Sequence, residues 1–253
     1  MRWLAIICIL LAPRLAVAQE EVVAGLSRDA ISITANFDGS DLLIYGAVKR
    51  ETPIPTQSRL DVVITVEGPS EPVTARRKAR KMGIWVNTAS VEIDRAPSFY
   101  AVATTAPLND ILSQTEDLRQ RISTRQRIRS IGAPSEIADS AAFTDALIRI
   151  REDKGLYSLR EGSVDLMADT LFRTTVDLPA NLVEGAYKTR IFLLRDKALV
   201  ARHETMIDVR KVGLERWLFD LAQNQPVIYA MLALVIAAVS GWLASAAFRL
   251  LRN

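Results

Sequence analysis

An uncharged run of 22 residues near the C-terminus, at positions 227–248, constrains this chain more than any other feature. The run reads VIYAMLALVIAAVSGWLASAAF. As an α-helix it would be about 33 Å long, which matches the hydrocarbon core of a bilayer. Pro226 precedes it at the first helical turn, where a missing N–H is tolerated. The alternative is a helix buried in a soluble core. So long a run without a charge disfavours that alternative, and we predict a single transmembrane helix over 226–248.

The charges around this helix indicate which way it crosses the membrane. Arg249 and Arg252 follow it directly, and Asp220 precedes it. Basic residues collect on the cytoplasmic side of membrane helices. The sequence therefore predicts a cytoplasmic tail at 249–253 and places the bulk of the chain on the other side.

One face of the predicted helix carries small residues spaced four apart: Ala233, Ala237, Gly241 and Ser245. Small residues at this spacing let membrane helices approach one another closely. The stripe indicates a helix–helix contact, with a second copy of the chain or with a larger membrane protein. The alternative is that small residues are simply common in such helices.

The segment just before the span, at 213–225, has the pattern of a short amphipathic helix. Its apolar side consists of Leu214, Trp217, Leu218 and Leu221. Tryptophan is enriched at the membrane–water interface. We therefore expect a juxtamembrane helix that lies along the outer membrane surface.

The N-terminus has the organisation of a secretory signal peptide. Arg2 supplies a positive start, residues 3–12 form a ten-residue apolar stretch, and Ala16 and Ala18 have the spacing of a cleavage site. We predict a signal peptide at 1–18, with cleavage before Gln19. The only cysteine, Cys8, lies inside the apolar stretch rather than at its end, which argues against a lipoprotein. The predicted location is the bacterial inner membrane with a periplasmic ectodomain.

The charge distribution argues against a nucleic-acid-binding protein. The formal net charge is +3, with 32 basic and 29 acidic residues. Four of the basic residues lie in the two end segments, whereas every acidic residue lies between Glu20 and Asp220. The segment between the ends is therefore close to neutral, and the basic character of the whole chain reflects export and topology.

The remaining sequence predicts a mainly β ectodomain. Apolar residues alternate with polar ones over much of 31–105 and again after 171, with Gly and Pro at the turns. Between them the spacing becomes helical. We expect an immunoglobulin-like antiparallel β-sandwich with an inserted helical hairpin. Its parts would be an N-terminal β-sandwich region at 19–106, the helical hairpin at 107–155 and a C-terminal β region at 156–212. The last region either completes the first sandwich or forms a second one.

One cluster of charges is a candidate binding site. Five cations occupy six consecutive positions: Arg76, Arg77, Lys78, Arg80 and Lys81. They could contact an anion or an acidic partner. The alternative is a solvated edge strand, on which lysine and arginine discourage edge-to-edge pairing. A second basic stretch at 119–129 lies on a predicted helix and fits a solvent-exposed face.

The sequence offers little for catalysis. The chain has one His and one Cys, which is too few for common metal centres. His203 follows the apolar face of a predicted strand, and no motif of a nucleophile with its base accompanies it. We therefore expect no enzymatic activity, no cofactor and no metal.

Three runs of sequence resemble a known family. They lie at 33–48, 77–93 and 96–108, and their shared residues are of turn and packing types: Gly39, Gly46, Trp85, Asn87, Pro97, Tyr100 and Pro107. The chain resembles Alph_Pro_TM, a transmembrane protein family of alphaproteobacteria, along essentially its whole mature length. The resemblance implies a final single membrane helix. It also implies an accessory role beside a sulfite-exporter-like permease, because genes of the family often lie next to such permeases. It assigns no catalytic residue.

These features together predict a membrane-anchored periplasmic accessory or interaction protein. Its partners would be the membrane and either a permease or a second copy of the chain, bound through the transmembrane helix. The alternative function is a periplasmic anion-binding module tethered to the inner membrane, with residues 76–81 as its site.

Overall fold

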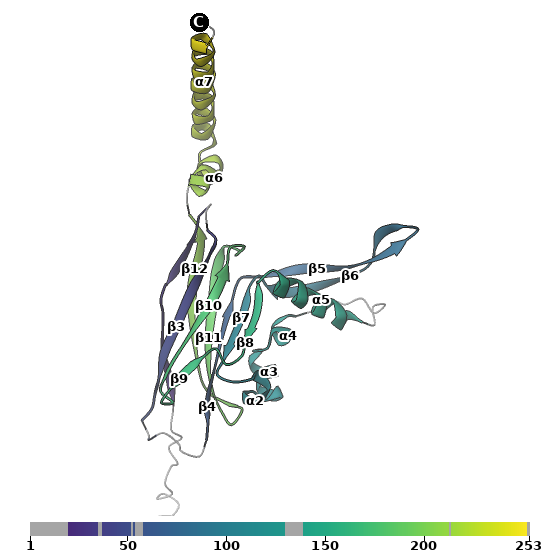
Figure 1. Cartoon of the computed structure of the whole chain (residues 1–253), viewed down its shortest axis with the longest axis vertical. Coiled ribbons are helices and arrows are strands. Elements are labelled where there is room, and N and C mark those ends of the chain that lie inside the picture. Colours follow the sequence, from purple (N-terminus) through teal and green to yellow (C-terminus); the bar gives the residue numbers. More distant parts are fainter. Residues whose placement is uncertain are drawn as a thin grey trace, which may run out of the picture.

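The structure is a computed structural model that describes residues 20–34, 37–51, 53, 58–129, 139–212 and 214–251. The predicted signal peptide at 1–18 lies outside the described residues. The body is mainly β, and a long helix extends from one end of it (Figure 1).

Two sheets form the body. The four-stranded sheet has the order β1 (Glu21–Leu26), β3 (Gly39–Lys49), β10 (Leu171–Pro179) and β9 (Asp165–Met167). The six-stranded sheet has the order β2 (Ala30–Ile33), β12 (Ala198–Lys211), β11 (Gly185–Arg195), β4 (Leu60–Glu67), β7 (Tyr100–Thr104) and β8 (Tyr157–Arg160). Strands from the two halves of the chain are neighbours in both sheets, since β10 pairs with β3 and β11 with β4. The strands after residue 156 therefore complete the same body and do not form a second one.

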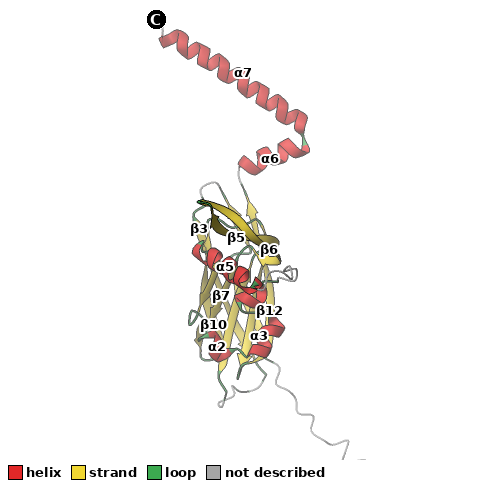
Figure 2. Ribbon diagram, turned by 90° about the vertical axis from the view of Figure 1, so that its right-hand side faces the viewer, coloured by secondary structure: helices red, strands yellow, loops and turns green. Residues whose placement is uncertain are grey.

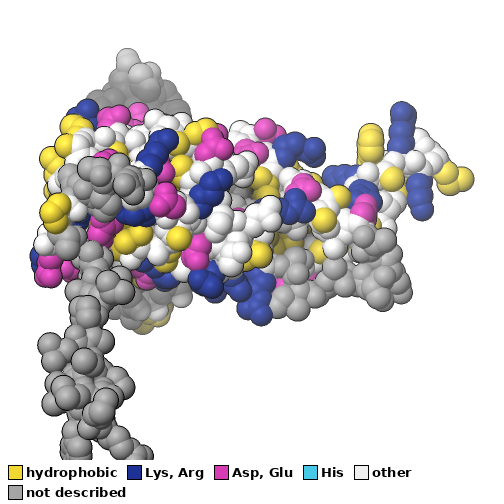
Figure 3. All heavy atoms as spheres, turned by 90° about the horizontal axis from the view of Figure 1, so that it is seen from below, with side chains coloured by type: hydrophobic (Ala, Val, Ile, Leu, Met, Phe, Trp, Pro, Cys, Tyr) yellow, Lys and Arg dark blue, Asp and Glu magenta, His cyan; other side chains and the backbone are white. Residues whose placement is uncertain are grey.

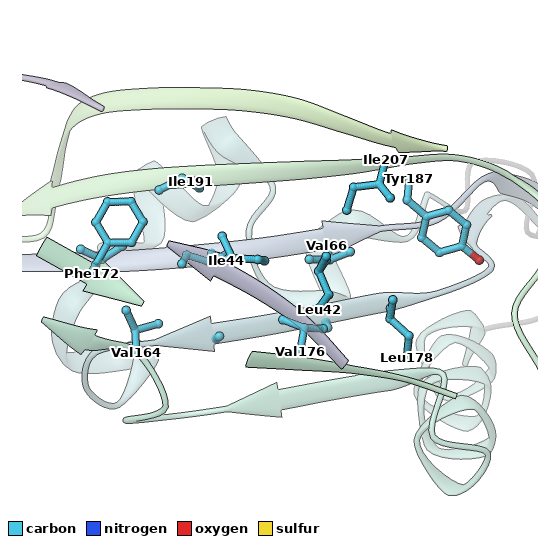
Figure 4. Close-up of a cluster of buried hydrophobic side chains, with 14 of the residues drawn as sticks. Leu42, Ile44, Val66, Val164, Phe172, Val176, Leu178, Tyr187, Ile191 and Ile207 are labelled. Carbon is cyan, nitrogen blue, oxygen red and sulfur yellow. The ribbon is translucent and has the colours of Figure 1, made fainter. Parts of the chain in front are cut away.

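The facing surfaces of the two sheets share one hydrophobic core. Phe172, Val176 and Leu178 point from β10 toward the side chains of the six-stranded sheet (Figure 4). Ile191 and Ile207 meet them from β11 and β12. Alternate residues of β10 are buried and exposed, as expected for a strand with one solvated face.

The outer face of the six-stranded sheet is covered by a second layer. Figure 2, seen from the side of this layer, shows α2, α3 and α5 in front of the strands. All eight residues of β4 are buried, because Val62 and Ile64 pack in the first core and Val63 packs in the second. The second core also contains Phe192 of β11 and side chains from the covering helices.

The six-stranded sheet is not purely antiparallel. β2 runs parallel to β12, and β8 runs parallel to β7. The expectation of an antiparallel body therefore fails at both edges of this sheet. A parallel neighbour requires a long connection, and the helical region supplies one between β7 and β8. The immunoglobulin-like arrangement stays a prediction.

The helical region differs from the expected hairpin of two helices. It contains α2 (Leu108–Ile111), α3 (Gln114–Gln120), α4 (Thr124–Arg127) and α5 (Ser140–Asp153), and residues 130–138 lie outside the description. The helix expected after Pro107 is broken into three for local reasons. The Ser113 hydroxyl accepts a hydrogen bond from the Glu116 amide and so starts a new helix. Arg121 then adopts a left-handed conformation (φ 52°), which ends it.

Two helices follow the body. α6 (Leu214–Asn224) coincides closely with the juxtamembrane helix predicted at 213–225. α7 (Pro226–Leu251) contains a 21-residue stretch, Pro226–Ala246, that is long and apolar enough to cross a membrane and is not buried in the protein. A lone helix with these properties and no protein covering suits a membrane span.

Candidate interaction site on the β5–β6 ribbon and the α5 cleft

A two-stranded ribbon projects from the body. It consists of β5 (Ser70–Lys81) and β6 (Ile84–Pro97), which are antiparallel and form a sheet of their own. The half near the body is held by buried side chains, since Val91, Ile93 and Ala96 are almost fully covered. The far half extends into solvent (Figure 1). The ribbon is thus a fixed arm with an exposed end.

The five cations predicted as a site all lie on β5, but the structure does not bring them to one place. Arg76 and Arg77 line a cleft near the body. Lys78, Arg80 and Lys81 lie farther out, and all three are exposed. A bulge between Arg77 and Lys78 interrupts the strand register and separates the two groups.

The cleft lies between β5 and α5 and has a volume of about 710 Å³. Apolar side chains form much of its lining: Val73, Ala75, Phe143, Leu147 and Ile150. Basic side chains from both elements accompany them: Arg76, Arg77, Arg149, Arg151 and Lys154. Such a mixture of apolar surface with a few charged groups is typical of a ligand site.

The basic residues of the cleft fall into two groups. Arg77 forms an ion pair of 2.6 Å with Asp139, and its guanidinium lies 4.6 Å from the centre of the Phe143 ring. In contrast, Arg76, Arg149 and Lys154 have no carboxylate within salt-bridge distance among the described residues. These three cations are therefore available to an incoming anionic group.

Arg151 anchors the base of the cleft, and sequence reasoning missed it. Its side chain is buried and donates a hydrogen bond to the carbonyl oxygen of Pro97. Tyr157 donates to the same oxygen at 2.7 Å. Burial raises the pKa of Tyr157 to about 12, although Arg151 opposes the shift. Arg151 also lies 3.9 Å from Glu71, so it is already engaged. Arg151 follows Phe143 and Leu147 at helical spacing on the buried side of α5, and this spacing is the signal that could have identified it.

The far end of the ribbon carries exposed apolar residues beside cations. Met82 and Gly83 form the turn, and Ile84 and Trp85 follow it on β6. Figure 3 shows hydrophobic and basic side chains together at the end of the projecting arm. In the sequence Trp85 stands out only as a residue of packing type. Its exposure became visible only in the structure.

The second basic stretch, at 119–129, is largely paired within the body. Arg127 forms an ion pair of 2.5 Å with the buried Glu67, and Arg119 pairs with Glu116 at 2.7 Å. Arg125 pairs with Asp145 of α5. The pairs of Arg125 and Arg127 join α4 to α5 and to β4, and the pair of Arg119 lies within α3, so the stretch has a structural role.

A buried polar cluster lies behind these helices. Arg190 is almost fully buried on β11 and donates to the backbone oxygens of Gln120 and Arg121 and to the Tyr100 hydroxyl. Tyr100 in turn donates to the Ile122 carbonyl oxygen at 2.6 Å. Burial raises the pKa of Tyr100 to about 12, and the charge of Arg190 opposes the shift. The cluster joins the helical layer to the sheet.

Other residues singled out in the sequence lie apart from the cleft. His203 is half-buried on β12 opposite Ile191. Within the described part of the chain, no group of three or more His, Cys, Asp or Glu residues could hold a metal ion. The small residues of α7 are exposed, and a Cβ added at Gly241 would meet no neighbouring atom. Trp217 of α6 is also exposed.

The fold and the site define a class: mainly β proteins that carry a projecting ribbon and a C-terminal apolar helix fit to cross a membrane. The chain belongs to the Alph_Pro_TM family, described as "Putative transmembrane protein", whose model matches residues 21–250. Membrane association therefore has the support of both the family and α7.

Comparisons beyond the family add little. No curated protein matches the chain. Among solved structures the chain is similar to the sporulation control protein Spo0M from Bacillus subtilis, with 11% sequence identity and a TM-score of 0.30. That match covers 81% of this chain and 55% of the Spo0M chain, so this chain spans about half the length of that protein. A similarity this weak carries no argument about function.

Proposed function

We propose that this protein is a membrane-anchored periplasmic interaction protein whose α5 cleft binds an acidic, partly apolar segment of a membrane partner. The observation that carries the proposal is an apolar cleft lining combined with three cations, Arg76, Arg149 and Lys154, that have no salt-bridge partner within the described part of the chain. The ectodomain would be an immunoglobulin-like scaffold that holds the cleft at a fixed place above the membrane.

The chemistry of the cleft favours a peptide segment with both acidic and apolar side chains. Unpaired cations near a low-dielectric surface attract carboxylates. The exposed side chain of Ile150 offers apolar contact area beside those cations. A segment that paired only with the cations would leave this apolar surface exposed to water. A purely apolar segment would leave the cations without partners.

The membrane anchor favours a partner in the same membrane. A protein held on one surface meets other proteins of that membrane at high effective concentration. We propose a sulfite-exporter-like permease as this partner, in line with the family resemblance, with the small-residue face of α7 as a second contact. Self-association through the same face is the competing outcome.

The proposed orientation has the ectodomain in the periplasm and the C-terminus in the cytoplasm. Arg249 and Arg252 after the span and the signal-like N-terminus support it. A reporter enzyme fused after Asn253 tests it directly. A reporter that is active only in the cytoplasm should be active at this position. Activity of a reporter that requires export would overturn the orientation.

Cross-linking in intact cells tests the partner. A photoreactive residue at Ile150, within the cleft, should capture a membrane protein, whereas the same residue at the exposed Leu171 should not. The double variant Arg149→Glu and Lys154→Glu should reduce capture at least tenfold, since it reverses two of the attracting charges. The double variant Lys49→Glu and Arg173→Glu, at two exposed positions of the four-stranded sheet, changes the net charge by the same amount and serves as the control. Capture that is indifferent to both variants would contradict the proposed cleft.

The cations of the cleft also favour a second candidate, a binding module for small anions. Calorimetry of the detergent-solubilised full chain against sulfite, sulfate and a sulfonate separates the two. Binding of one of these anions that is lost on Arg149→Glu and Lys154→Glu, without any cross-linked partner, would favour the anion-binding module.

A further inference from the structure

The end of the β5–β6 ribbon presents large apolar side chains to solvent. Met82 is fully exposed, and Ile84 and Trp85 are exposed to 65% and 69%. None of the three belongs to either hydrophobic core of the described body. Several large apolar side chains gathered on one exposed feature usually mark a binding surface.

The backbone at the ribbon end holds one of these side chains in an unfavourable conformation. Met82 has φ 50° and Gly83 has φ 87°, so both central residues of the tight turn are left-handed. Glycine or asparagine would occupy the first position at lower cost. The turn fixes an apolar side chain at the outermost point of the ribbon.

Each apolar residue next to the turn faces a cation across the ribbon. Ile84 pairs with Lys81, and Trp85 pairs with Arg80. The side chain of Arg80 bends toward the turn, where its Nε lies 3.4 Å from the Gly83 carbonyl oxygen. Lysine and arginine can place their stems on apolar surface while their charged groups reach the surroundings. The ribbon end thus combines an apolar tip with a basic collar.

This composition is that of a membrane interface. Tryptophan prefers the headgroup region, apolar side chains enter the acyl boundary, and basic residues bind anionic phosphates. α6, which directly precedes the membrane helix, has a similar character, with Trp217 and Phe219 exposed. The ribbon leaves the body in the half nearer α6, and its far end slants toward the α6–α7 end (Figure 1).

We propose that the tip of the β5–β6 ribbon inserts into the headgroup region of the same membrane that α7 crosses. Met82, Ile84 and Trp85 enter the interface, and Arg80 and Lys81 bind the phosphates of anionic lipids. In the view of Figure 1 the tip stands below α6, and Figure 2 shows that α7 is inclined to the long axis of the body, so contact of the tip with the membrane depends on how the body is tilted relative to α7. The protein is then held at two points. This proposal rests on α7 as a membrane anchor and is independent of what the cleft binds.

A fluorescent label at the tip tests the proposal. The full chain carrying Cys8→Ser and Met82→Cys is labelled with an environment-sensitive fluorophore and reconstituted in nanodiscs, of zwitterionic lipid alone or with anionic phosphatidylglycerol. We expect a blue shift, with quenching by lipids that carry a nitroxide on the headgroup, and both should be larger with the anionic lipid. The same label on Thr175→Cys, exposed on β10, should keep the emission of a fluorophore in water.

Variants separate the roles of charge and apolar surface. Arg80→Gln and Lys81→Gln should each weaken tip insertion on anionic lipid by roughly fivefold, because each variant removes one cation. A label on Ile84→Cys, which leaves Met82 in place, should repeat the blue shift. A label at residue 82 that stays as aqueous as at residue 175 on both lipids would overturn the proposal. A blue shift of the label that appears only after a membrane protein extract is added would also overturn the proposal, since that result assigns the tip to a protein partner.

Discussion

The guanidinium of Arg77 lies 4.6 Å from the centre of the Phe143 ring, and this contact joins β5 to α5. Phe143 is buried, whereas Arg77 is exposed on its far side and pairs there with Asp139. The two residues close one end of the α5 cleft. A cation–π contact supported by an ion pair therefore contributes to the position of α5 against the ribbon, together with Leu147 in the second core and Arg151 on the Pro97 carbonyl oxygen.

Removal of this contact should loosen α5. Phe143→Ala should lower the free energy of unfolding by about 3 kcal/mol, since it removes a buried aromatic side chain. Arg77→Ala should cost about 1 kcal/mol, because a partly exposed cation–π contact and a surface ion pair are both modest. Hydrogen exchange should show faster amide exchange in α5 for both variants. Arg77→Lys, which keeps the charge but not the planar group, should give an intermediate result. Unchanged exchange in Phe143→Ala would show that α5 is held by other contacts.

The buried tyrosines should make stability fall at alkaline pH. Burial raises the pKa of both Tyr100 and Tyr157 to about 12, against about 10 in the unfolded chain. The folded state therefore favours the neutral hydroxyls. Their contribution is complete below pH 10 and is lost as the pH rises from 10 to 12. Unfolding of the detergent-solubilised protein, followed across this range, should show the loss.

Single tyrosine variants identify the source of that pH dependence. Tyr100→Phe should reduce the loss between pH 10 and 12, and it should also cost about 1–3 kcal/mol at neutral pH, because the Ile122 carbonyl and Arg190 each lose a partner. Tyr45→Phe, on the exposed face of β3, is the control. An alkaline transition that is the same in Tyr100→Phe as in the unaltered chain would contradict this assignment.

Two neighbouring glutamates at the start of the body should differ sharply in their importance. Glu20 is buried and forms ion pairs with Arg50 at 2.7 Å and Arg195 at 2.8 Å. Glu20→Gln should therefore cost about 3 kcal/mol, since it leaves buried guanidinium groups without their counter-charge. Glu21 pairs with Lys49 in an exposed position, so Glu21→Gln should cost less than about 0.5 kcal/mol. Thermal unfolding of the two variants tests the contrast, and equal effects would refute it.

Gly46 should not tolerate a side chain. An added Cβ would lie 2.7 Å from the Val23 carbonyl oxygen and would also collide with the Phe172 ring in the core. Gly46→Ala should destabilise the protein by about 1–3 kcal/mol. Gly241→Ala on α7 meets no neighbour and should be neutral in the same unfolding measurement. If Gly46→Ala is equally neutral, the packing of β3 against Phe172 must be looser than described.

Local patterns predicted those elements whose surroundings are simple. The uncharged run predicted α7, and the amphipathic spacing predicted α6, because each pattern depends on contact with a single environment. The helices after Pro107 were less predictable, because Ser113 and Arg121 break them through capping contacts that hydrophobic periodicity does not reveal.

The candidate site was visible only in part. The basic residues of β5 stood out in the sequence, but Arg76 and Arg149 line the same cleft across more than seventy positions of chain, which no local pattern can indicate. Arg151 was missed because it is charged, yet its helical spacing matches the buried side of α5. The apolar end of the ribbon shows the opposite case, because its residues look buried in the sequence but are exposed in the structure. Ile84 and Trp85 fit a core strand by composition, and only the fold places them in solvent.

The parallel pairing of β2 with β12 has a mechanical consequence for a tethered protein. β12 is the strand that leads into α6 and α7, and it is hydrogen-bonded along its length to β11 on one side and at its end to β2 on the other. Tension from the membrane enters the body along the axis of this strand. The force then loads many backbone hydrogen bonds at once, in shear, instead of breaking them one by one. The membrane helix is therefore joined to the body at a mechanically resistant strand.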